Sequence, residues 1–301
     1  MQAARFAPAP RRGRPPSVFL LAAFLWALAA FVLAWELLAY AIRFYEVASS
    51  GEKPDVRRGL LNTVGLFLFE CASFYAILVT GPLGFLWPFR PPAKSSRPPL
   101  LLVHGYFLTR ASLLVLAWRL RREGFPVVIA ANYKTVRGEI HEMARRLGRE
   151  IDAALAASGH DRVHVVAHSL GGLVARTYLR DRGGDARIER LVTLGTPHQG
   201  TKVAVFAFDP LARELRPGSR LLNELGREDP VPSLTEVTSI FSPFDALVLP
   251  PRNAYYRGAG NIEIEGVGHH ALLFSPKVFR LLVESLSDDA AVPIAGKASL
   301  S

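Results

Sequence analysis

The segment Ala-His-Ser-Leu-Gly-Gly at residues 167–172 constrains the fold of this chain more than any other part of it. An apolar run at residues 163–166 comes directly before it, and an amphipathic stretch at residues 173–179 follows. This order predicts a strand, a sharp turn and a helix, with Ser169 at the apex of the turn. Small residues stand two positions from the serine on both sides, because the strand and helix backbones approach closely in such a turn. The segment therefore predicts a strained, outward-facing serine nucleophile.

A serine attacks a substrate efficiently when a histidine removes its proton. Near the C-terminus, residues 261–266 alternate like a half-exposed strand and run into Val267-Gly268-His269-His270. His269 directly follows a glycine in this loop, which gives the backbone room to turn toward the serine. We expect His269 to be the general base, with His270 as the alternative.

An acidic side chain must hold that histidine in the correct tautomer. A β-rich run at residues 237–241 is followed by the turn Ser242-Pro243-Phe244-Asp245. This order places Asp245 just after a strand and makes it the predicted acid; an Asx turn or a helix N-cap is its structural alternative. Asp209 and Asp229 are rival candidates, but both stand in a stretch without strand character.

Hydrolysis through a serine also needs two N–H groups that bind the oxyanion of the tetrahedral intermediate. One is expected from Leu170, the residue after the nucleophile. The other should follow an earlier strand, and the apolar run at residues 100–103 leads into His104-Gly105-Tyr106-Phe107. Tyr106 is the predicted second donor through its main chain, and His104 is expected to shape this loop by hydrogen bonding.

The other histidines near these motifs favour structural roles. His168 and His198 are expected to pack within the serine turn and a later loop. None of the eight histidines has the spacing of zinc ligands. The sequence therefore predicts neither a metal ion nor another cofactor.

Several motifs follow one another in order across residues 98–288. They are His104-Gly105-Tyr106-Phe107, Ala167-His168-Ser169-Leu170-Gly171-Gly172, Gly195-Thr196-Pro197-His198-Gln199-Gly200, Ser242-Pro243-Phe244-Asp245, and Gly266-Val267-Gly268-His269 followed by Leu272-Leu273-Phe274. In these motifs the chain resembles the bacterial lipase/esterase branch of the α/β-hydrolases. The resemblance implies ester hydrolysis through an acyl-enzyme, with Ser169, Asp245 and His269 as the triad and Tyr106 and Leu170 at the oxyanion hole.

Periodicity predicts an α/β fold over residues 100–288, with a mostly parallel sheet and helices on both faces. Expected strands cover residues 100–103, 126–131, 163–167, 190–194 and 237–241, and expected helices cover residues 112–123, 138–157 and 170–180. Residues 199–232 break the alternation and are predicted to form a lid or cap. Phe206 and Phe208 of this segment are expected to line an acyl-chain pocket; an irregular surface insertion is the alternative.

The N-terminal third predicts two transmembrane helices at about residues 18–42 and 60–86, within a region that ends at residue 89. Both runs are apolar and long enough to cross a bilayer, and the first exceeds the ~7–15 apolar residues of a signal peptide. A basic tail at residues 1–17 precedes them, and a Pro-rich linker at residues 90–99 is expected to space the membrane from the enzyme. Residues 289–301 are predicted to be a disordered tail.

Each predicted span contains one acid, Glu36 or Glu70. A carboxylate in hydrocarbon is costly and faces a protein interior or the interface. One hypothesis is that the two acids mark a contact face between helices or copies of the chain. The simpler interpretation, which we favour, is that Glu36 extends to the lipid headgroups near Arg43.

The formal net charge of +10 suits a protein beside anionic lipid headgroups. Basic clusters occur at residues 11–14, 119–122 and 145–149, and no nucleic-acid-binding motif accompanies them. After two crossings, the basic residues on the N-terminal side outnumber those in the connecting loop, which favours a hydrolase domain in the cytoplasm at a bacterial inner membrane. Lone Cys71 cannot form an intrachain disulfide.

The sequence thus predicts a membrane-anchored serine hydrolase that cleaves lipid or other hydrophobic carboxylic esters. A thioesterase or an acyltransferase of the same fold would carry the same side chains. A membrane scaffold that has lost turnover is the alternative from another class. Membrane lipids and an ester substrate are the expected partners, and the sequence indicates no protein partner.

Overall fold

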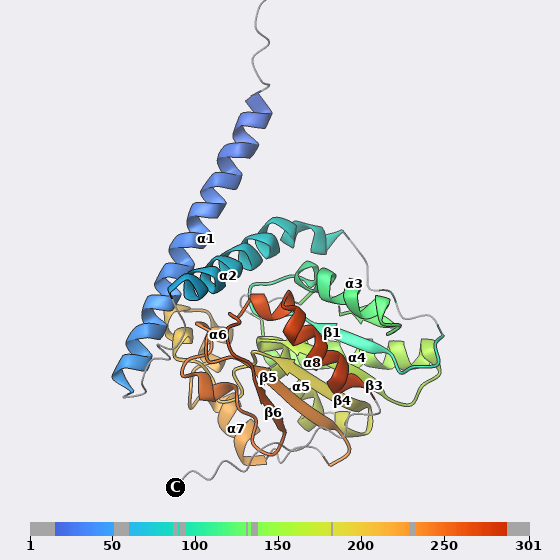
Figure 1. Cartoon of the computed structure of the whole chain (residues 1–301). Helices are drawn as coiled ribbons and strands as arrows, with labels where there is room; N and C mark the ends of the chain where they lie inside the picture. The colour runs from blue at the N-terminus through green and yellow to red at the C-terminus, as the bar shows by residue number, and fades with distance from the viewer. Residues whose placement is uncertain are drawn as a thin grey trace, which may run out of the picture.

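The computed structural model describes residues 16–50, 60–86, 90, 94–130, 132–133, 138–181, 183–228 and 233–287. Two helices at the N-terminus adjoin an α/β domain that begins at Leu100 (Figure 1). Most of the predicted N-terminal tail and the whole predicted C-terminal tail, residues 1–15 and 289–301, lie outside the described residues.

The α/β domain is built on one sheet of six parallel strands in the order β2-β1-β3-β4-β5-β6. The strands are β1 (Leu100–Val103), β2 (Val127–Ile129), β3 (Val163–His168), β4 (Ile188–Leu194), β5 (Glu236–Phe241) and β6 (Gly260–Glu263). Every residue of β1 and β3 is buried, since helices cover both faces and leave the central strands no solvated side. The predicted mostly parallel sheet is confirmed.

Residues of β1 point alternately into two hydrophobic clusters, one on each face of the sheet. Leu101 and Val103 pack with α4 (Ile140–Ser158) and α5 (Leu170–Asp181). Leu100 and Leu102 pack on the other face with α3 (Leu114–Arg122) and α8 (Pro276–Leu286). The predicted helices and strands are recovered within a few residues of their expected ends.

The strand order reverses at β1. From β1 the chain passes outward to β2, and from β3 it passes to β4 on the other side. Loops that leave the carboxyl ends of β1 and β3 therefore diverge, and such a switch point is where open parallel sheets bind ligands. The loop after β1 contains Gly105 and Tyr106, and the turn after β3 contains Ser169.

The segment predicted as a lid folds into the 3-10 helix η4 (Lys202–Phe206), α6 (Pro210–Glu214) and α7 (Arg220–Glu228). Its leucines pack into the core beside α5; they are Leu211, Leu215, Leu221, Leu222 and Leu225. Phe206 and Phe208 are 57% and 81% exposed, so the expectation that they line a pocket is wrong for this structure. The leucines anchor the segment, and the phenylalanines remain on the surface.

The N-terminal helices are α1 (Pro16–Ser49) and α2 (Leu60–Thr80), and the 3-10 helix η1 (Gly81–Phe85) continues α2. Both helices are long and apolar enough to cross a membrane by length and composition. They are antiparallel neighbours over part of their length, where Tyr40 packs edge-on against Phe67 with ring centroids 5.5 Å apart. The N-terminal half of α1 projects away from the α/β domain, and α2 lies across that domain (Figure 1).

One face of α2 packs on the α/β domain. Glu70, Ser73 and Ile77 are buried and recur at helical spacing. The contact continues into η1, where the Thr109 hydroxyl donates to the carbonyl oxygen of Gly81 at 2.9 Å. Residues 94–99 of the Pro-rich linker also lie on the domain, because the Arg97 guanidinium donates to the Glu123 carbonyl oxygen at 2.8 Å. The helices are therefore packed on the α/β domain and are not held away from it by a spacer.

Candidate active site

Ser169 occupies the turn between β3 and α5, and its φ of +53° lies in the left-handed region. A residue with a Cβ pays a steric cost there, so the surrounding structure must hold it in place. The Ser169 N–H donates to the Leu194 carbonyl oxygen at 2.9 Å. The Ser169 carbonyl oxygen accepts hydrogen bonds from the Gly172 N–H at 3.0 Å and from the Thr196 hydroxyl at 2.9 Å. The serine backbone is thus fixed from both sides.

Two glycines let the loop after β1 approach this turn. A Cβ on Gly171 would lie 2.8 Å from the carbonyl oxygens of Val103 and His104. A Cβ on Gly105 would lie 2.9 Å from the Cβ of Ser169. Both distances are too short for real carbon atoms, so these positions accept only glycine while the backbones stay in contact. The close approach explains why a small residue, Gly171, stands two positions after the serine. Gly105 permits the same approach from the loop after β1.

Asp245 and His269 form a buried pair. The Nδ1 of His269 donates to Oδ2 of Asp245 at 2.6 Å, and both residues are almost fully buried. The other carboxylate oxygen, Oδ1, accepts from the N–H groups of Leu247 at 2.7 Å and Val248 at 3.0 Å. Asp245 therefore forms its own Asx-type turn and also binds the histidine. The turn fixes the carboxylate, and the carboxylate fixes the Nδ1–H tautomer of His269.

Gly195, at the end of β4, makes room for this pair. Its φ is +57°, and a Cβ there would lie 3.2 Å from Oδ2 of Asp245 and 3.3 Å from Nδ1 of His269. The sequence motif Gly195-Thr196-Pro197 predicts a turn after a strand. The structure adds that the missing side chain leaves the acid and the base in contact.

His168 contributes a contact that sequence reasoning missed. Its Nε2 donates to the carbonyl oxygen of His269 at 3.1 Å. Burial is the main cause that lowers the pKa of His168 well below its ordinary value, so the ring is neutral. The sequence assigned this residue to packing, and its only signal was its position next to Ser169. His168 supports the backbone of His269 from the β3 side.

His104 and His198 have the structural roles that the sequence predicts. The Nδ1 of His104 donates to the Gly105 carbonyl oxygen at 3.0 Å, and burial lowers the pKa of His104 to about 4. Its ring stacks on Tyr133 with centroids 4.2 Å apart. His198 is buried beside Thr193, 3.0 Å from its hydroxyl. Both side chains therefore hold loops in place.

The predicted oxyanion donors lie on either side of the switch point. Leu170 is the first residue of α5, where a backbone N–H has no acceptor within its own helix. Tyr106 directly follows Gly105, whose backbone touches the serine turn. The Tyr106 hydroxyl donates to Oδ2 of Asp209 and ties this loop to the cap.

Asp209 is the N-cap of α6. Its Oδ1 accepts from the N–H groups of Leu211 at 3.1 Å and Ala212 at 3.3 Å. It bonds no histidine in the structure, so it is not brought into the site as an acid. The other rival, Asp229, lies outside the described residues.

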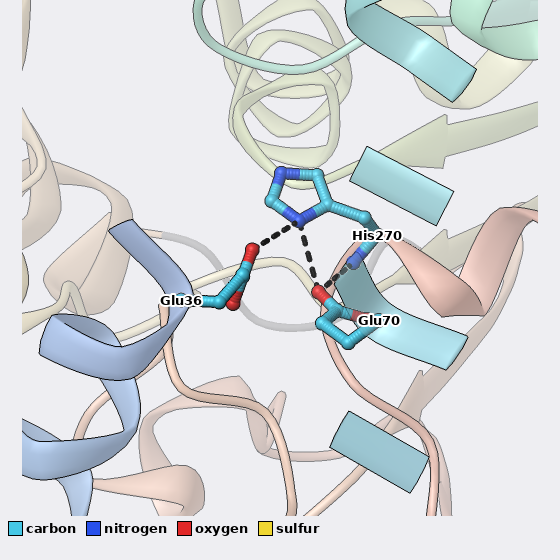
Figure 2. A group of neighbouring side chains, drawn as sticks. All are labelled: Glu36, Glu70 and His270. Atoms are coloured by element: carbon cyan, nitrogen blue, oxygen red, sulfur yellow. Dashed lines mark hydrogen bonds and ion pairs between the residues drawn. The ribbon is translucent and has the colours of Figure 1, made fainter. Parts of the chain in front are cut away.

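His270, the alternative base, binds two acids from the N-terminal helices (Figure 2). Its Nδ1 lies 2.9 Å from Oε1 of Glu70 and 3.4 Å from Oε1 of Glu36. Burial alone would lower the pKa of His270, but the two carboxylates outweigh it and raise the pKa to about 9. The His270 ring therefore binds Glu36 and Glu70 of the N-terminal helices, and His269 is the histidine that pairs with Asp245.

This arrangement corrects the expectations for Glu36 and Glu70. Each side chain is 1% exposed, so Glu36 does not extend to headgroups. The acids do lie at a contact face, but its partner is the loop after β6 of the same chain. Within the described part of the chain, Glu36, Glu70 and His270 are also the group close enough to hold a metal ion, with ligand atoms within 4.8 Å of one another. In the structure Glu70 hydrogen-bonds to His270 and Ala271, and Glu36 forms an ion pair with the His270 ring.

The basic clusters of the α/β domain bond largely within it. Arg119 donates to the Phe274 carbonyl oxygen at 2.9 Å. Arg145 and Arg149 both bond to the Glu142 carboxylate. These contacts are typical of solvated helix faces. The cluster at residues 11–14 lies outside the described residues.

In a comparison with known families, residues 88–207 match the model of a family described as a domain of unknown function, DUF7379. This range includes the loop after β1 and the serine turn.

Solved structures of lipases are similar in fold. The mature lipase BlEst2 of Bacillus licheniformis has a TM-score of 0.56 at 17% sequence identity, over 67% of this chain and 96% of that chain. Lipase B of Aspergillus fumigatus has a TM-score of 0.58 at 18% identity, over 73% of this chain and 58% of that chain. The monoacylglycerol lipase of Paleococcus ferrophilus has a TM-score of 0.52 at 17% identity, over 66% and 97%. At these identities the likeness establishes the fold, and the chain has the α/β-hydrolase fold.

Replacement of Asp245 by Asn tests the assignment of the acid. The amide keeps the size and the turn of Asp245 but favours the wrong tautomer of His269, so we expect kcat for ester hydrolysis to fall by about 10⁴-fold. Asp209→Asn tests the rival acid, and we expect a much smaller loss, because asparagine still caps α6 and its amide can still bond to the Tyr106 hydroxyl. Steady-state kinetics on a chromogenic ester compares the two variants; a large loss in Asp209→Asn with normal kcat in Asp245→Asn would reverse the assignment.

Proposed function

We propose that this protein is a serine hydrolase that cleaves the carboxylic ester bonds of lipids or other hydrophobic esters. The 2.6 Å hydrogen bond between His269 and Asp245 carries the proposal. It prepares an imidazole in the tautomer of a general base. The His269 backbone bonds to His168, which directly precedes the strained residue Ser169, and this supports the pairing of His269 with that serine. The α/β-hydrolase fold and the lipase titles of its structural neighbours support the choice of ester chemistry.

The proposed reaction begins when the Ser169 hydroxyl attacks the ester carbonyl carbon and His269 takes its proton. The negative charge that develops on the carbonyl oxygen is stabilised by the N–H groups of Tyr106 and Leu170. Asp245 stabilises the imidazolium that forms. His269 then protonates the leaving alcohol, and the acyl group remains on Ser169.

A water molecule completes the cycle. His269 removes a proton from this water, which attacks the acyl-enzyme carbonyl, and the second tetrahedral intermediate releases the acid and Ser169. All proton transfers use His269, so the scheme requires no metal ion or cofactor.

Replacement of Ser169 by Ala provides the first test of the function. Full-length protein in detergent should hydrolyse p-nitrophenyl esters and should react with a fluorophosphonate probe, and both signals should vanish in Ser169→Ala because no other atom can form the acyl-enzyme. Wild-type protein that is inert in both assays would favour the scaffold alternative. Labelling without hydrolysis would favour an acyltransferase.

We further propose that α1 anchors the protein in a membrane. The N-terminal half of α1 projects from the α/β domain (Figure 1). Residues 18–35 cover most of this half and span about 27 Å at 1.5 Å per residue, close to the thickness of a hydrocarbon core. Large exposed apolar side chains cover this part on several sides; they include Phe19, Leu20, Phe24, Trp26 and Phe31. Beyond it, Glu36 and the following turns contact the α/β domain.

In this proposal α2 does not cross the membrane, which differs from the two crossings that the sequence predicts. Its buried face, from Glu70 to Ile77, is committed to the α/β domain, so immersion of the whole helix would carry polar domain surface into hydrocarbon. Its outward face is apolar and exposed, as at Leu61 and Leu68, and suits the membrane surface. One crossing places the N-terminus and the α/β domain on opposite faces of the membrane.

Topology can be tested on full-length protein with an epitope tag at each end. With one crossing, protease added to intact spheroplasts should remove one tag and spare the other. Protease added after detergent lysis should remove both tags, which controls for tags that are shielded by folding. Equal protection of the two tags in intact spheroplasts would instead support two crossings and the cytoplasmic location that follows from them.

The cap phenylalanines test the lipid preference. Phe206 and Phe208 lie on the surface of the segment that Asp209 ties to the oxyanion loop. Transfer of two such side chains into lipid is worth several kcal/mol in total, about 1.5–3 kcal/mol for each. We expect Phe206→Ser with Phe208→Ser to lower the ratio of activity on long-chain micellar ester to that on short soluble ester by about tenfold or more. Leu234→Ser, an exposed control outside the cap, should keep the ratio; an unchanged ratio in the double variant would contradict a role of the cap in lipid contact.

A further inference from the structure

The loop after β6 carries His269 and receives support from three directions. Asp245 binds the His269 ring, and His168 binds the His269 carbonyl oxygen. The third support comes from Glu70, which belongs to α2 and is distant in sequence. The Glu70 carboxylate is the only one of the three that links the proposed active site to the N-terminal helices.

Glu70 accepts three hydrogen bonds from two consecutive residues of this loop, and Figure 2 shows the two that His270 donates. Its Oε1 accepts from the His270 N–H at 2.7 Å and from the His270 Nδ1 at 2.9 Å. Its Oε2 accepts from the Ala271 N–H at 2.9 Å. The carboxylate is 1% exposed, so little water is available to replace these bonds if it is removed.

Gly268, which precedes His269, leaves the space that the Glu70 carboxylate occupies. A Cβ on Gly268 would lie 2.2 Å from Oε2 and 2.5 Å from Cδ of Glu70. The φ of Gly268 is not in the left-handed region, so the backbone itself would accept alanine. The sequence suggested that Gly268 frees the backbone to turn. The structure shows that its missing side chain is the space that Glu70 occupies.

Phe74 and Glu36 also contact the His270 ring and help to hold it against Glu70. Phe74, one helical turn along α2, stacks on the His270 ring with centroids 4.2 Å apart. Glu36 approaches the same imidazole nitrogen from α1. Two helices and the loop therefore meet at one buried cluster, directly beside the residue that pairs with Asp245.

We propose that Glu70 is a positioning residue of the hydrolase: it clamps the loop beside His269 through hydrogen bonds to His270 and Ala271 and packs closely against Gly268, so that the N-terminal helices form part of the active-site framework. This inference rests on the proposed function only for its effect on turnover. Its effect on the loop is independent of catalysis. Glu70 touches no reacting atom and acts through the placement of the His269 ring.

A double-mutant cycle on full-length protein tests the clamp. Glu70→Ala leaves the loop N–H groups without an acceptor, and we expect kcat to fall about 10–100-fold with little change in KM, since small displacements of a catalytic group cost rates of this order. Gly268→Ala should have a similar effect, because its methyl group displaces the carboxylate. In Glu70→Ala the carboxylate that the Gly268→Ala methyl group would meet is absent. The double variant should therefore have the same kcat as Glu70→Ala alone. Effects that multiply, or normal kcat in Glu70→Ala, would overturn the proposal.

The matched control is Glu46→Ala, which removes another carboxylate at the contact of α1 with the α/β domain. Glu46 bonds to Lys202 at 2.5 Å in the cap and does not contact the loop. This variant should keep kcat within about twofold, as expected for the loss of a partly exposed ion pair. If Glu70→Ala does not fold, Glu70→Gln replaces it, because its amide keeps the shape but loses the charge that accepts these N–H groups.

Hydrogen–deuterium exchange supplies a readout that needs no turnover. The peptide that covers residues 266–274 should exchange faster in the Glu70 variants than in wild type, and at the wild-type rate in Glu46→Ala. Faster loop exchange in a protein that lacks esterase activity even as wild type would leave the clamp in place and reject the proposed function. Unchanged exchange together with unchanged kcat would reject the clamp and leave the hydrolase.

Discussion

The close contact between the loop after β1 and the turn after β3 is the constraint on which the rest of this structure depends. Gly105 and Gly171 allow that contact, and a Cβ on either would lie within 2.9 Å of the opposing atoms. The contact holds Ser169 at a positive φ and brings the loop that contains Tyr106 against the turn that precedes Leu170. A strained residue persists only where its surroundings determine its position, and here the sheet supplies them.

The remaining residues of the proposed triad arrive from the neighbouring strands. Asp245 follows β5, and His269 follows β6, so parallel order brings both loops to the same edge of the sheet as Ser169. Their pairing depends on further details at that edge: the Asx-type turn of Asp245, the missing side chain of Gly195 and the His168 bond to the His269 backbone. Each of these features limits the positions that the His269 ring can take. None of them involves the Ser169 hydroxyl, where the reaction is proposed.

The N-terminal helices have both an exposed apolar surface and a buried polar contact with the α/β domain. Much of their surface is apolar and exposed, as suits lipid. Yet two buried carboxylates on their inner faces meet His270, and charges in such surroundings are tolerated only with partners. The acids therefore bind the helices to one position on the α/β domain. The anchor proposed for α1, joined in this way, would carry the domain at a defined orientation relative to the membrane.

The sequence by itself determined the sheet, its helices, the serine turn and the pairing of Asp245 with His269, because strand periodicity and short turn motifs depend on residues close in the chain. It also recognised that Glu36 and Glu70 need partners. Only the tertiary structure decided who those partners are, since Glu70 meets a loop 200 residues away in the chain. For the same reason the roles of His168, Gly195 and Gly268, and the exposure of Phe206 and Phe208, emerged only from the fold: each depends on space left by a distant segment, which no local pattern encodes.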